Sequence, residues 1–147
     1  MYTVTIANST DELAAVIDLR YRILRKPWNQ PFETATDGME EKCVNAYITD
    51  EDRVIACCRL QVNEGNVGQI RFMAVEESMQ GKGLGTLILE KLEQQAEKLR
   101  LTRIELQARE NAVSFYERQG YSIKEKSFLL WGIIQHYLMW KDFVPAL

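Results

Sequence analysis

The chain has 147 residues, of which 46% are apolar and 27% charged, and its 18 basic residues against 21 acidic ones give a formal net charge of −3. This length suits one domain over 1–147 with a hydrophobic core of its own. The acidic balance argues against nucleic acid as a partner, because phosphate binding needs a basic face. No apolar run approaches the roughly 20 residues that a membrane helix needs, so we expect no membrane association.

The chain has three cysteines, Cys43, Cys57 and Cys58, and no C-x-x-C pair. An odd count without paired spacing indicates reduced thiols in a cytoplasmic protein. The opening residues, Met1 to Val4, do not resemble a signal or transit peptide. We favour buried apolar packing over a nucleophilic role for the thiols, and we expect no metal site. Cys57 and Cys58 are adjacent in a strand-like run, so they should point to opposite faces of a sheet.

The first 42 residues predict a strand, a helix and a long irregular segment. β-Branched residues alternate over 2–7, which is typical of a strand. Ser9 and Glu12 have the spacing of a capping box, so a helix should begin at Thr10. The segment 26–42 contains two prolines and two aromatic residues. It is either a shaped loop that contacts substrate or a packed connection whose aromatic residues fill the core, and both interpretations stay open.

The rest of the chain alternates between strands and helices. Short turns should join three strands into an antiparallel meander. An apolar stripe from Leu84 to Leu99 marks the longer helix, and Gly120 should end the shorter one in the left-handed conformation. The expected elements are strands at 44–49, 54–62 and 69–75, a helix at 84–101, a strand at 103–108, a helix at 111–119, and strands at 121–125 and 134–141. The order β-α-β-β-β-α-β-α-β-β predicts an α/β fold with a mixed, mostly antiparallel sheet and helices on both faces.

A glycine-rich loop, Gln80 to Gly85, lies between a strand and the longer helix. The first turn of a helix has unpaired N–H groups and the positive end of the helix dipole, and glycines let the backbone approach an oxygen-rich ligand. Such a site suits a pyrophosphate, to which Lys82 would add a charge. The P-loop pattern is absent, and the dinucleotide fingerprint fails because the third glycine comes one position early. A tight turn without a ligand would need neither three glycines nor the accompanying Gln and Lys.

Two motifs at the right distance from each other carry a family resemblance. Three residues of the loop match a Q/R-x-x-G-x-G/A core: Gln80, Gly83 and Gly85. From Asn111 to Tyr121 the chain then reads N-A-V-S-F-Y-E-R-Q-G-Y. These segments resemble motifs A and B of the GCN5-related N-acetyltransferases (GNAT family), and 135–141 is similar to the closing strand of that family. The resemblance spans nearly the whole chain and implies the GNAT fold, with acetyl-CoA (coenzyme A) as the bound donor.

The resemblance also implies which residues hold acetyl-CoA. In the family, the strand before the loop diverges from its neighbour and binds the pantetheine arm through its backbone, here at Met73 and Val75, with Ala74 between them. The pyrophosphate would lie on the amides of seven consecutive residues: Gln80, Gly81, Lys82, Gly83, Leu84, Gly85 and Thr86. The motif B members of the set are Asn111, near the pantetheine, then Ser114, and Tyr116, beside the thioester sulfur.

The chemistry that the resemblance implies is direct attack of an amine on the thioester. The amine must lose a proton, and the departing thiolate is helped by a proton donor. Tyr116 is expected as this donor, although an aromatic residue packed on the helix would look the same in the sequence. Many family members carry a glutamate where this chain has Gln69, which leaves the base open. It is a water relay, or His136, whose unperturbed pKa of about 6.5 suits the task, or one of four loop carboxylates: Glu33, Asp37, Glu40 and Glu41.

The acceptor is not readable from the sequence. The residues expected near it are Trp28, Phe32, Glu33 and Gln69. Acidic residues of the 33–41 loop would attract a cation, whereas the basic residues Arg22, Arg25 and Lys26 would equally bind a carboxylate.

The expected function is therefore an N-acetyltransferase that acts on an amine of a small molecule or peptide. The alternative is a non-catalytic acyl-CoA-binding sensor, and a domain that faces nucleic acid has the least support. A homodimer through exposed strand edges is a further expectation.

Overall fold

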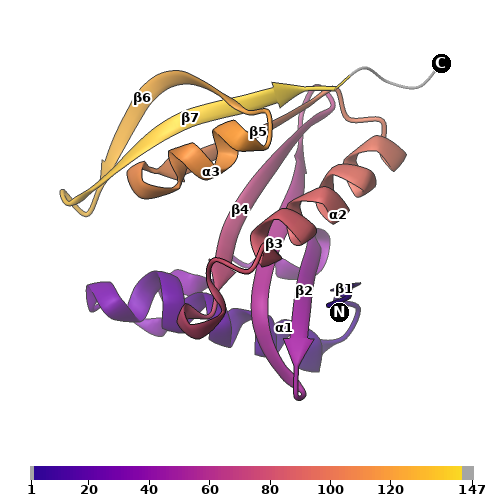
Figure 1. Cartoon of the computed structure of the whole chain (residues 1–147), viewed down its shortest axis with the longest axis vertical. Coiled ribbons are helices and arrows are strands. Elements are labelled where there is room, and N and C mark those ends of the chain that lie inside the picture. Colours follow the sequence, from indigo (N-terminus) through magenta and orange to yellow (C-terminus); the bar gives the residue numbers. More distant parts are fainter. Residues whose placement is uncertain (1, 144–147) are drawn as a thin grey trace.

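A computed structural model of the chain describes residues 2–143 (Figure 1). Seven strands form one sheet in the order β1-β2-β3-β4-β5-β7-β6, in which only β4 and β5 run parallel. The strands are β1 (Val4–Ile6), β2 (Val44–Asp50), β3 (Arg53–Asn63), β4 (Val67–Val75), β5 (Arg103–Arg109), β6 (Ser122–Leu130) and β7 (Ile134–Asp142). The predicted α/β class, the element order and the antiparallel meander β2-β3-β4 are confirmed.

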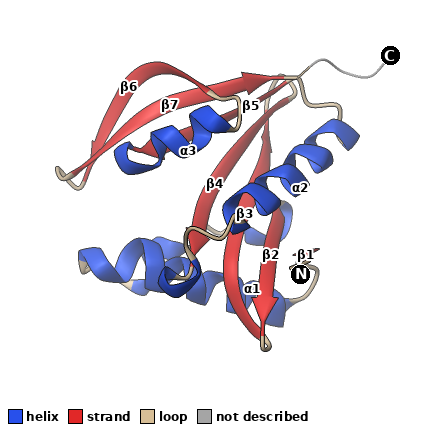
Figure 2. Ribbon diagram, in the orientation of Figure 1, coloured by secondary structure: helices blue, strands red, loops and turns tan. Residues whose placement is uncertain are grey.

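Helices cover both faces of this sheet (Figure 2). They are α1 (Thr10–Arg20), α2 (Leu84–Lys98) and α3 (Val113–Arg118). Cys57 packs with Val16 and Leu19 of α1, whereas its neighbour Cys58 belongs to the cluster formed with α2. Because adjacent strand residues point to opposite faces, α1 and α2 lie on opposite sides of β3. Both thiols are free and buried, as predicted, and burial raises the pKa of each.

The start of α1 is fixed by the residues that predicted it. The Ser9 side chain accepts a hydrogen bond from the Glu12 N–H at 3.2 Å, and the Glu12 carboxylate accepts one from the Asn8 N–H at 3.2 Å. These bonds satisfy amides that the helix itself leaves unpaired. The helix continues into a π-helical turn, Tyr21–Arg25.

The predicted irregular segment contains three short 3₁₀ turns, Lys26–Trp28, Phe32–Ala35 and Glu40–Lys42. Buried polar groups tie the segment to the sheet. The Arg20 guanidinium donates to the Asn45 side-chain oxygen at 2.7 Å and to the Glu40 carboxylate at 3.2 Å. The segment is therefore held close against the α1 face.

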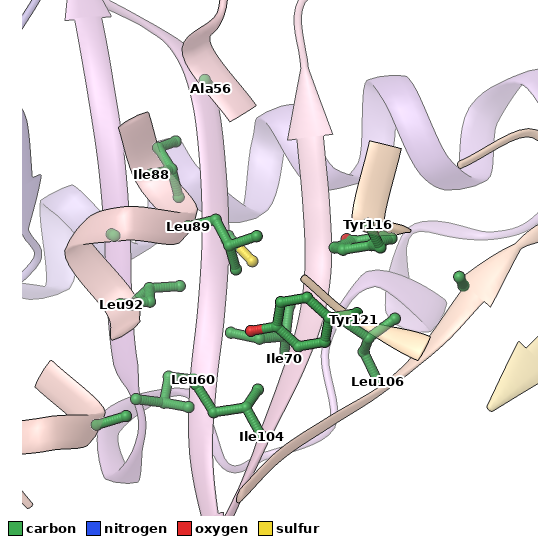
Figure 3. Close-up of a cluster of buried hydrophobic side chains, with 14 of the residues drawn as sticks. Ala56, Leu60, Ile70, Ile88, Leu89, Leu92, Ile104, Leu106, Tyr116 and Tyr121 are labelled. Carbon is green, nitrogen blue, oxygen red and sulfur yellow. The ribbon is translucent and has the colours of Figure 1, made fainter. Parts of the chain in front are cut away.

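The larger part of the core lies on the α2 face (Figure 3). Leu84, Ile88, Leu92 and Ala96 of the predicted stripe are buried there against β3, β4 and β5. The predicted end of this helix was wrong, because α2 stops at Lys98 and Leu99 is 49% exposed. Hydrophobic periodicity alone did not reveal the left-handed turn after the helix, where φ is +58° at Arg100.

The C-terminal part is a long hairpin of β6 and β7 beside α3. The strand predicted at 121–125 runs instead from Ser122 to Leu130. The helix predicted at 111–119 is a 3₁₀ turn, Glu110–Ala112, followed by the shorter α3. Gly120 adopts φ +95°, as expected for the residue that ends this helix. No helix among residues 2–143 is long and apolar enough to cross a membrane.

Candidate active site

The central feature of the site is a gap where β4 and β5 separate. The two strands pair only from Val67 and Arg103 to Ile70 and Leu106, although β4 continues to Val75 and β5 to Arg109. β5 stays paired with β7 along its whole length, whereas beyond Ile70 and Leu106 it separates from β4 (Figure 1). The facing backbone groups of β4 are therefore left without a strand partner over its last residues.

The backbone of Met73 and Val75 faces this gap. The Glu76 N–H donates to the Ile55 carbonyl of β3 at 2.7 Å. Because peptide groups alternate in direction along a strand, those of Met73 and Val75 point away from β3. Ala74 is placed differently: its backbone faces β3, and its side chain is buried in the α1 cluster.

A β-bulge in β4 sets which side chains flank the gap. The β3–β4 register shifts between Cys57 and Arg59, and Phe72 has φ +58°. Such a conformation is an outlier for a bulky residue and is typical of functional segments. The extra residue puts the side chains of Arg71 and Phe72 on the same face, the one that α1 covers.

The loop before α2 presents unpaired amides beside the gap. Gly81 has φ +81° and Gly83 has φ +80°, a region that favours glycine. Gly83 precedes the first residue of α2, and no side chain caps this helix. The Gly83 carbonyl already binds the Leu87 N–H at 3.2 Å. The N–H groups of residues 84–86 are thus the free donors of the first turn, together with the positive end of the helix dipole.

Gly85 also has a packing role that the sequence did not indicate. Its φ is not positive, but a Cβ there would lie 3.2 Å from the Phe115 ring. The absence of a side chain lets α3 pack on the start of α2. A second contact supports this packing, since the Gln119 side chain donates to the Thr86 hydroxyl at 3.1 Å. The two motifs of the sequence therefore meet in space.

The remaining predicted loop residues have distinct surroundings. The Gln80 side-chain amide donates to the Val75 carbonyl at 3.1 Å and so ties the loop to the end of β4. Lys82 is exposed and makes no ion pair within residues 2–143. The Leu84 side chain is buried, so only its backbone N–H is available to a ligand.

Of the motif B residues, Tyr116 is buried and the other two are exposed. The Tyr116 ring lies edge-on to Phe115 and Tyr121 and packs in the α2-face core (Figure 3). Burial raises the pKa of its phenol well above the ordinary range, so the hydroxyl keeps its proton. Its oxygen makes no hydrogen bond within residues 2–143. Asn111 and Ser114 lie exposed at the start of this helical segment.

His136 lies in β7 directly opposite Arg109 of β5. Its Nδ1 is 3.0 Å from the Ile134 carbonyl, and its ring stacks on Phe128. Because a carbonyl only accepts, Nδ1 carries the proton in this contact, and Nε2 of the neutral ring keeps its lone pair. Burial, and then the charges of Arg109 and Arg25, hold the pKa of His136 below its ordinary value.

Two of the loop carboxylates that were candidate bases are engaged in ion pairs. Asp37 binds both terminal nitrogens of Arg59, at 2.8 and 2.6 Å. These bonds hold the pKa of Asp37 far below its usual range. Glu40 is buried and binds Arg20 and Arg59 at 3.2 and 3.3 Å. Asp37 is therefore not suited to accept a proton from an amine at neutral pH, and the Glu40 carboxylate is occupied by two guanidiniums.

Gln69 is also engaged, since its side-chain oxygen accepts from Asn63 at 3.0 Å and from Gln61 at 3.3 Å. Glu33 and Glu41 are exposed and make no ion pair within residues 2–143. These two carboxylates stay candidates on geometry alone.

The aromatic residues predicted on the acceptor side are both partly exposed. Trp28 is 37% exposed, and its ring centroid lies 6.5 Å from that of Trp131 in the β6–β7 turn. Phe32 lies edge-on to Tyr21 and is half exposed. Neither aromatic fills the core, which favours the shaped-loop interpretation of segment 26–42.

Sequence reasoning missed an arginine cluster around Phe72. The guanidinium carbons of Arg20, Arg59, Arg71 and Arg25 lie 4.4 to 5.7 Å from the centre of its ring. The one available signal was the presence of arginines within otherwise apolar strand segments. It could not reveal that they converge on one aromatic ring.

Two other hollows lie apart from the gap. They have volumes of about 330 and 360 Å³ and lie beside the start of α1 and the 3₁₀ turn at Glu40. Neither is lined by a predicted cofactor residue. Within residues 2–143 no group of three or more His, Cys, Asp or Glu side chains is arranged to hold a metal ion.

Comparison with known proteins identifies the family that has this arrangement. The model of the acetyltransferase (GNAT) family matches residues 13–121. The chain belongs to the GNAT family. It is thus an N-acetyltransferase by family, and the resemblance of its two motifs is confirmed.

The similarity to individual proteins extends over most of this GNAT chain. It is 29% identical over 138 residues to the uncharacterized N-acetyltransferase YjcF of Bacillus subtilis, which covers 93% of this chain and 97% of that protein. It is also 29% identical over 127 residues to the [ribosomal protein bS18]-alanine N-acetyltransferase of Salmonella typhimurium, covering 83% and 82% of the two chains. The crystal structure of an acyl-CoA N-acyltransferase from Pseudomonas aeruginosa superposes with a TM-score of 0.83 at 22% identity, covering 97% of this chain and 99% of the other.

Proposed function

We propose that this GNAT protein transfers the acetyl group of acetyl-CoA to an amine of a small molecule or peptide. The observation that carries the proposal is the β4–β5 gap, whose open backbone groups adjoin the uncapped start of α2. A pantetheine arm needs backbone donors and acceptors along an extended path, and a pyrophosphate needs clustered amides. The chain offers both in one continuous stretch from Met73 to Thr86.

In this proposal, acetyl-CoA supplies the acetyl group as a thioester, and the chain holds and orients it. The backbone of Met73 and the N–H of Val75 would bind the pantetheine, and the amides of residues 81–86 would bind the pyrophosphate. The Gln80 N–H, also predicted for the pyrophosphate, already donates to the Glu77 carbonyl at 3.4 Å. Asn111 and Ser114 would lie along the same ligand. The Gln80 bond to the Val75 carbonyl stabilises the corner between the two binding stretches.

Two side chains would transfer protons during the reaction, one as the donor to the sulfur and one as the base for the amine. Tyr116 keeps the proton on its phenolic oxygen at neutral pH, so this hydroxyl is the proposed donor to the departing sulfur, although burial also makes it a weaker acid than a free phenol. His136 is the preferred base, because its Nε2 is unprotonated at neutral pH and makes no hydrogen bond within residues 2–143. The engagement of Asp37 and Glu40 by arginines supports this choice.

The proposal includes an amine acceptor, a cytoplasmic location and a single domain. The name of the Salmonella typhimurium relative, an alanine N-acetyltransferase, supports an amine as the acceptor. Three free thiols agree with a cytoplasmic location. The proposal treats residues 1–147 as one acetyltransferase domain.

The test is release of free CoA from acetyl-CoA over a panel of polyamines, amino acids, aminoglycosides and peptides. For the amine that is acetylated best, Tyr116→Phe should lower kcat by about 100-fold or more, the range of general acid catalysis. The affinity for acetyl-CoA should stay unchanged, because the ring remains. Unchanged turnover would overturn the role of Tyr116. Tight acetyl-CoA binding without CoA release for any amine would favour the acyl-CoA sensor instead.

A further inference from the structure

The arginine cluster around Phe72 consists of Arg20, Arg25, Arg59 and Arg71, and Arg109 adjoins it by its hydrogen bond to the Leu24 carbonyl. Its inner pair, Arg20 and Arg59, is buried and neutralised. Arg20 binds Glu40 at 3.2 Å, and Arg59 binds Glu40 at 3.3 Å and Asp37 at 2.6 Å. These ion pairs connect α1, β3 and the loop and have a structural role.

The outer arginines, Arg25, Arg71 and Arg109, are not neutralised in this way. Arg25 donates to the carbonyls of Thr34 and Leu24 at 3.1 and 3.2 Å, and Arg109 donates to the Leu24 carbonyl at 3.0 Å. Within residues 2–143 no carboxylate lies within ion-pair distance of Arg25 or Arg109. Arg71 only shares Asp37, at 3.3 Å.

The charge balance of the cluster is strongly positive. The four clustered arginines and Arg109 carry five positive charges, and the two carboxylates bound to them, Asp37 and Glu40, carry two negative charges. The excess is three positive charges. The whole chain has a net charge of −3, so this local excess opposes the overall sign. Burial lowers the pKa of all three outer arginines, and the pKa of Arg25 falls to about 10, with the charges of Arg109, Arg71 and Arg20 contributing after burial. A bound anion would offset the cost of burying these guanidiniums and their mutual repulsion.

The outer arginines come from the elements that border the gap. Arg71 follows Ile70, the last residue of β4 that pairs with β5. Arg109 ends β5 opposite His136. Arg25 lies 5.4 Å from the ring centre of Trp131, and its turn is bonded to Arg109 through the Leu24 carbonyl. The positive charge is thus next to the proposed base and to the aromatic residues of the acceptor side.

We propose that the outer arginines bind a carboxylate of the acceptor, so that the acceptor is an amine that also carries a free carboxylate, such as an amino acid or a compact amino carboxylic acid. This inference rests on the proposed function and names its substrate class. Guanidiniums suit a carboxylate because their planar donors match its two oxygens. It favours a carboxylate-bearing acceptor over a cationic one, the two alternatives that the sequence left open. Of the loop carboxylates that would attract a cation, Asp37 and Glu40 are themselves bound by arginine, whereas Glu33 and Glu41 make no ion pair within residues 2–143.

The kinetic test compares amines in matched pairs that differ only in the anion. Each amino acid of the panel is compared with its carboxamide, and polyamines and aminoglycosides serve as cationic competitors. We expect the best acceptor to carry a free carboxylate and its amide to have a kcat/KM lower by on the order of 10- to 100-fold, as for one charge-assisted contact. A neutral or cationic amine as the best acceptor would overturn the inference.

The variant test removes one guanidinium at a time. Arg109→Gln should raise KM for the carboxylate amine by on the order of 10- to 100-fold, leave the acetyl-CoA KM unchanged and abolish the preference for acid over amide. Arg109→Lys should keep part of the preference. Arg100→Gln, in an exposed residue after α2, is the matched control. If Arg109→Gln unfolds at a lower temperature than wild type, Arg71→Gln replaces it, because the Arg71 side chain is 39% exposed and makes no hydrogen bond to the backbone of residues 2–143. A preference that survives both Gln variants contradicts the inference.

A binding measurement separates this inference from the proposed function. Glutarate, a dicarboxylate without an amine, is titrated calorimetrically into the protein saturated with CoA. Saturable binding that Arg109→Gln weakens and Arg100→Gln does not supports the anion site, even if no amine is acetylated and the proposed transfer fails. If glutarate does not bind, or binds equally to the Gln variant, the inference fails while acetyl transfer still stands on its own assay.

Discussion

At the scale of single residues, the local surroundings of His136 determine what it can do. The Ile134 carbonyl fixes the proton on Nδ1, and burial keeps the ring neutral to a lower pH than usual. A histidine exposed to solvent would titrate near its ordinary pKa. It would then be half protonated under mildly acidic conditions and would be less useful as a base.

This environment predicts the pH dependence of the enzyme. Because the pKa of folded His136 lies below about 6.5, wild-type kcat should stay level as the pH falls through 6.5 and decline only below that. His136→Gln should lower kcat by about 100-fold or more and remove the acidic limb of the profile. An unchanged acidic limb in the variant would assign that limb to another group and contradict the role of His136.

The same shift affects stability with a definite sign. The unfolded chain binds a proton at His136 more readily than the folded one, so this contribution to stability is complete above about 6.5 and is lost as the pH falls toward the folded pKa. The thermal unfolding midpoint (Tm) of wild type should therefore fall as the pH is lowered through that window, and the Tm of His136→Gln should fall less. Equal slopes for the two proteins would show that the histidine is not perturbed.

At the scale of secondary-structure elements, the start of α2 depends on two glycines for unrelated reasons. Gly83 supplies a left-handed backbone in open space, whereas Gly85 makes room for Phe115. Gly83→Ala should therefore destabilise the fold by about 1–2 kcal/mol and weaken acetyl-CoA binding, since the following amides shift. Gly83→Asn is the matched control, because asparagine tolerates this conformation better. Urea unfolding and calorimetric titration measure both effects.

Gly85→Ala should behave differently. A few tenths of an ångström of movement in the Phe115 ring relieves the 3.2 Å contact, and alanine favours the helix by up to about 1 kcal/mol. The stability change should be small. A loss as large as that of Gly83→Ala would mean that the packing of α3 on α2 is more rigid than the contact indicates.

How much of the site was predictable follows from how local each cause is. The Ser9 cap and the Gly83 turn depend on neighbours in the sequence, so their residues could be recognised directly. The bulge at Phe72 depends on the register with β3, and the arginine cluster depends on contacts between residues far apart in the chain. The predicted end of α2 was wrong because the apolar residue Leu99 extends the periodic stripe beyond the helix. The element order could be predicted, whereas the acceptor-side chemistry could not.

At the scale of the whole molecule, the sheet has two edges, β1 and β6. Edge strands have unpaired backbone groups that favour pairing with another chain. Exposed apolar side chains lie on β6, with Ile123 43% and Leu129 52% exposed. The homodimer expected from the sequence stays a prediction, and β6 is the edge that fits it. Light scattering after size exclusion should give twice the 17.1 kDa mass of the chain, and Ile123→Lys should give the monomer. A monomeric wild type at all concentrations would contradict this.

The central claim is that acetyl-CoA lies in the β4–β5 gap and on the start of α2. The most direct measurement is the change in backbone amide NMR shifts on titration with acetyl-CoA. We predict the largest changes at Met73, Val75 and residues 80–86, with smaller changes at Asn111 and Ser114. Changes concentrated instead at the hollows beside the start of α1, around residues 7–13 and 40–45, with the loop at 80–86 unaffected, would contradict the account.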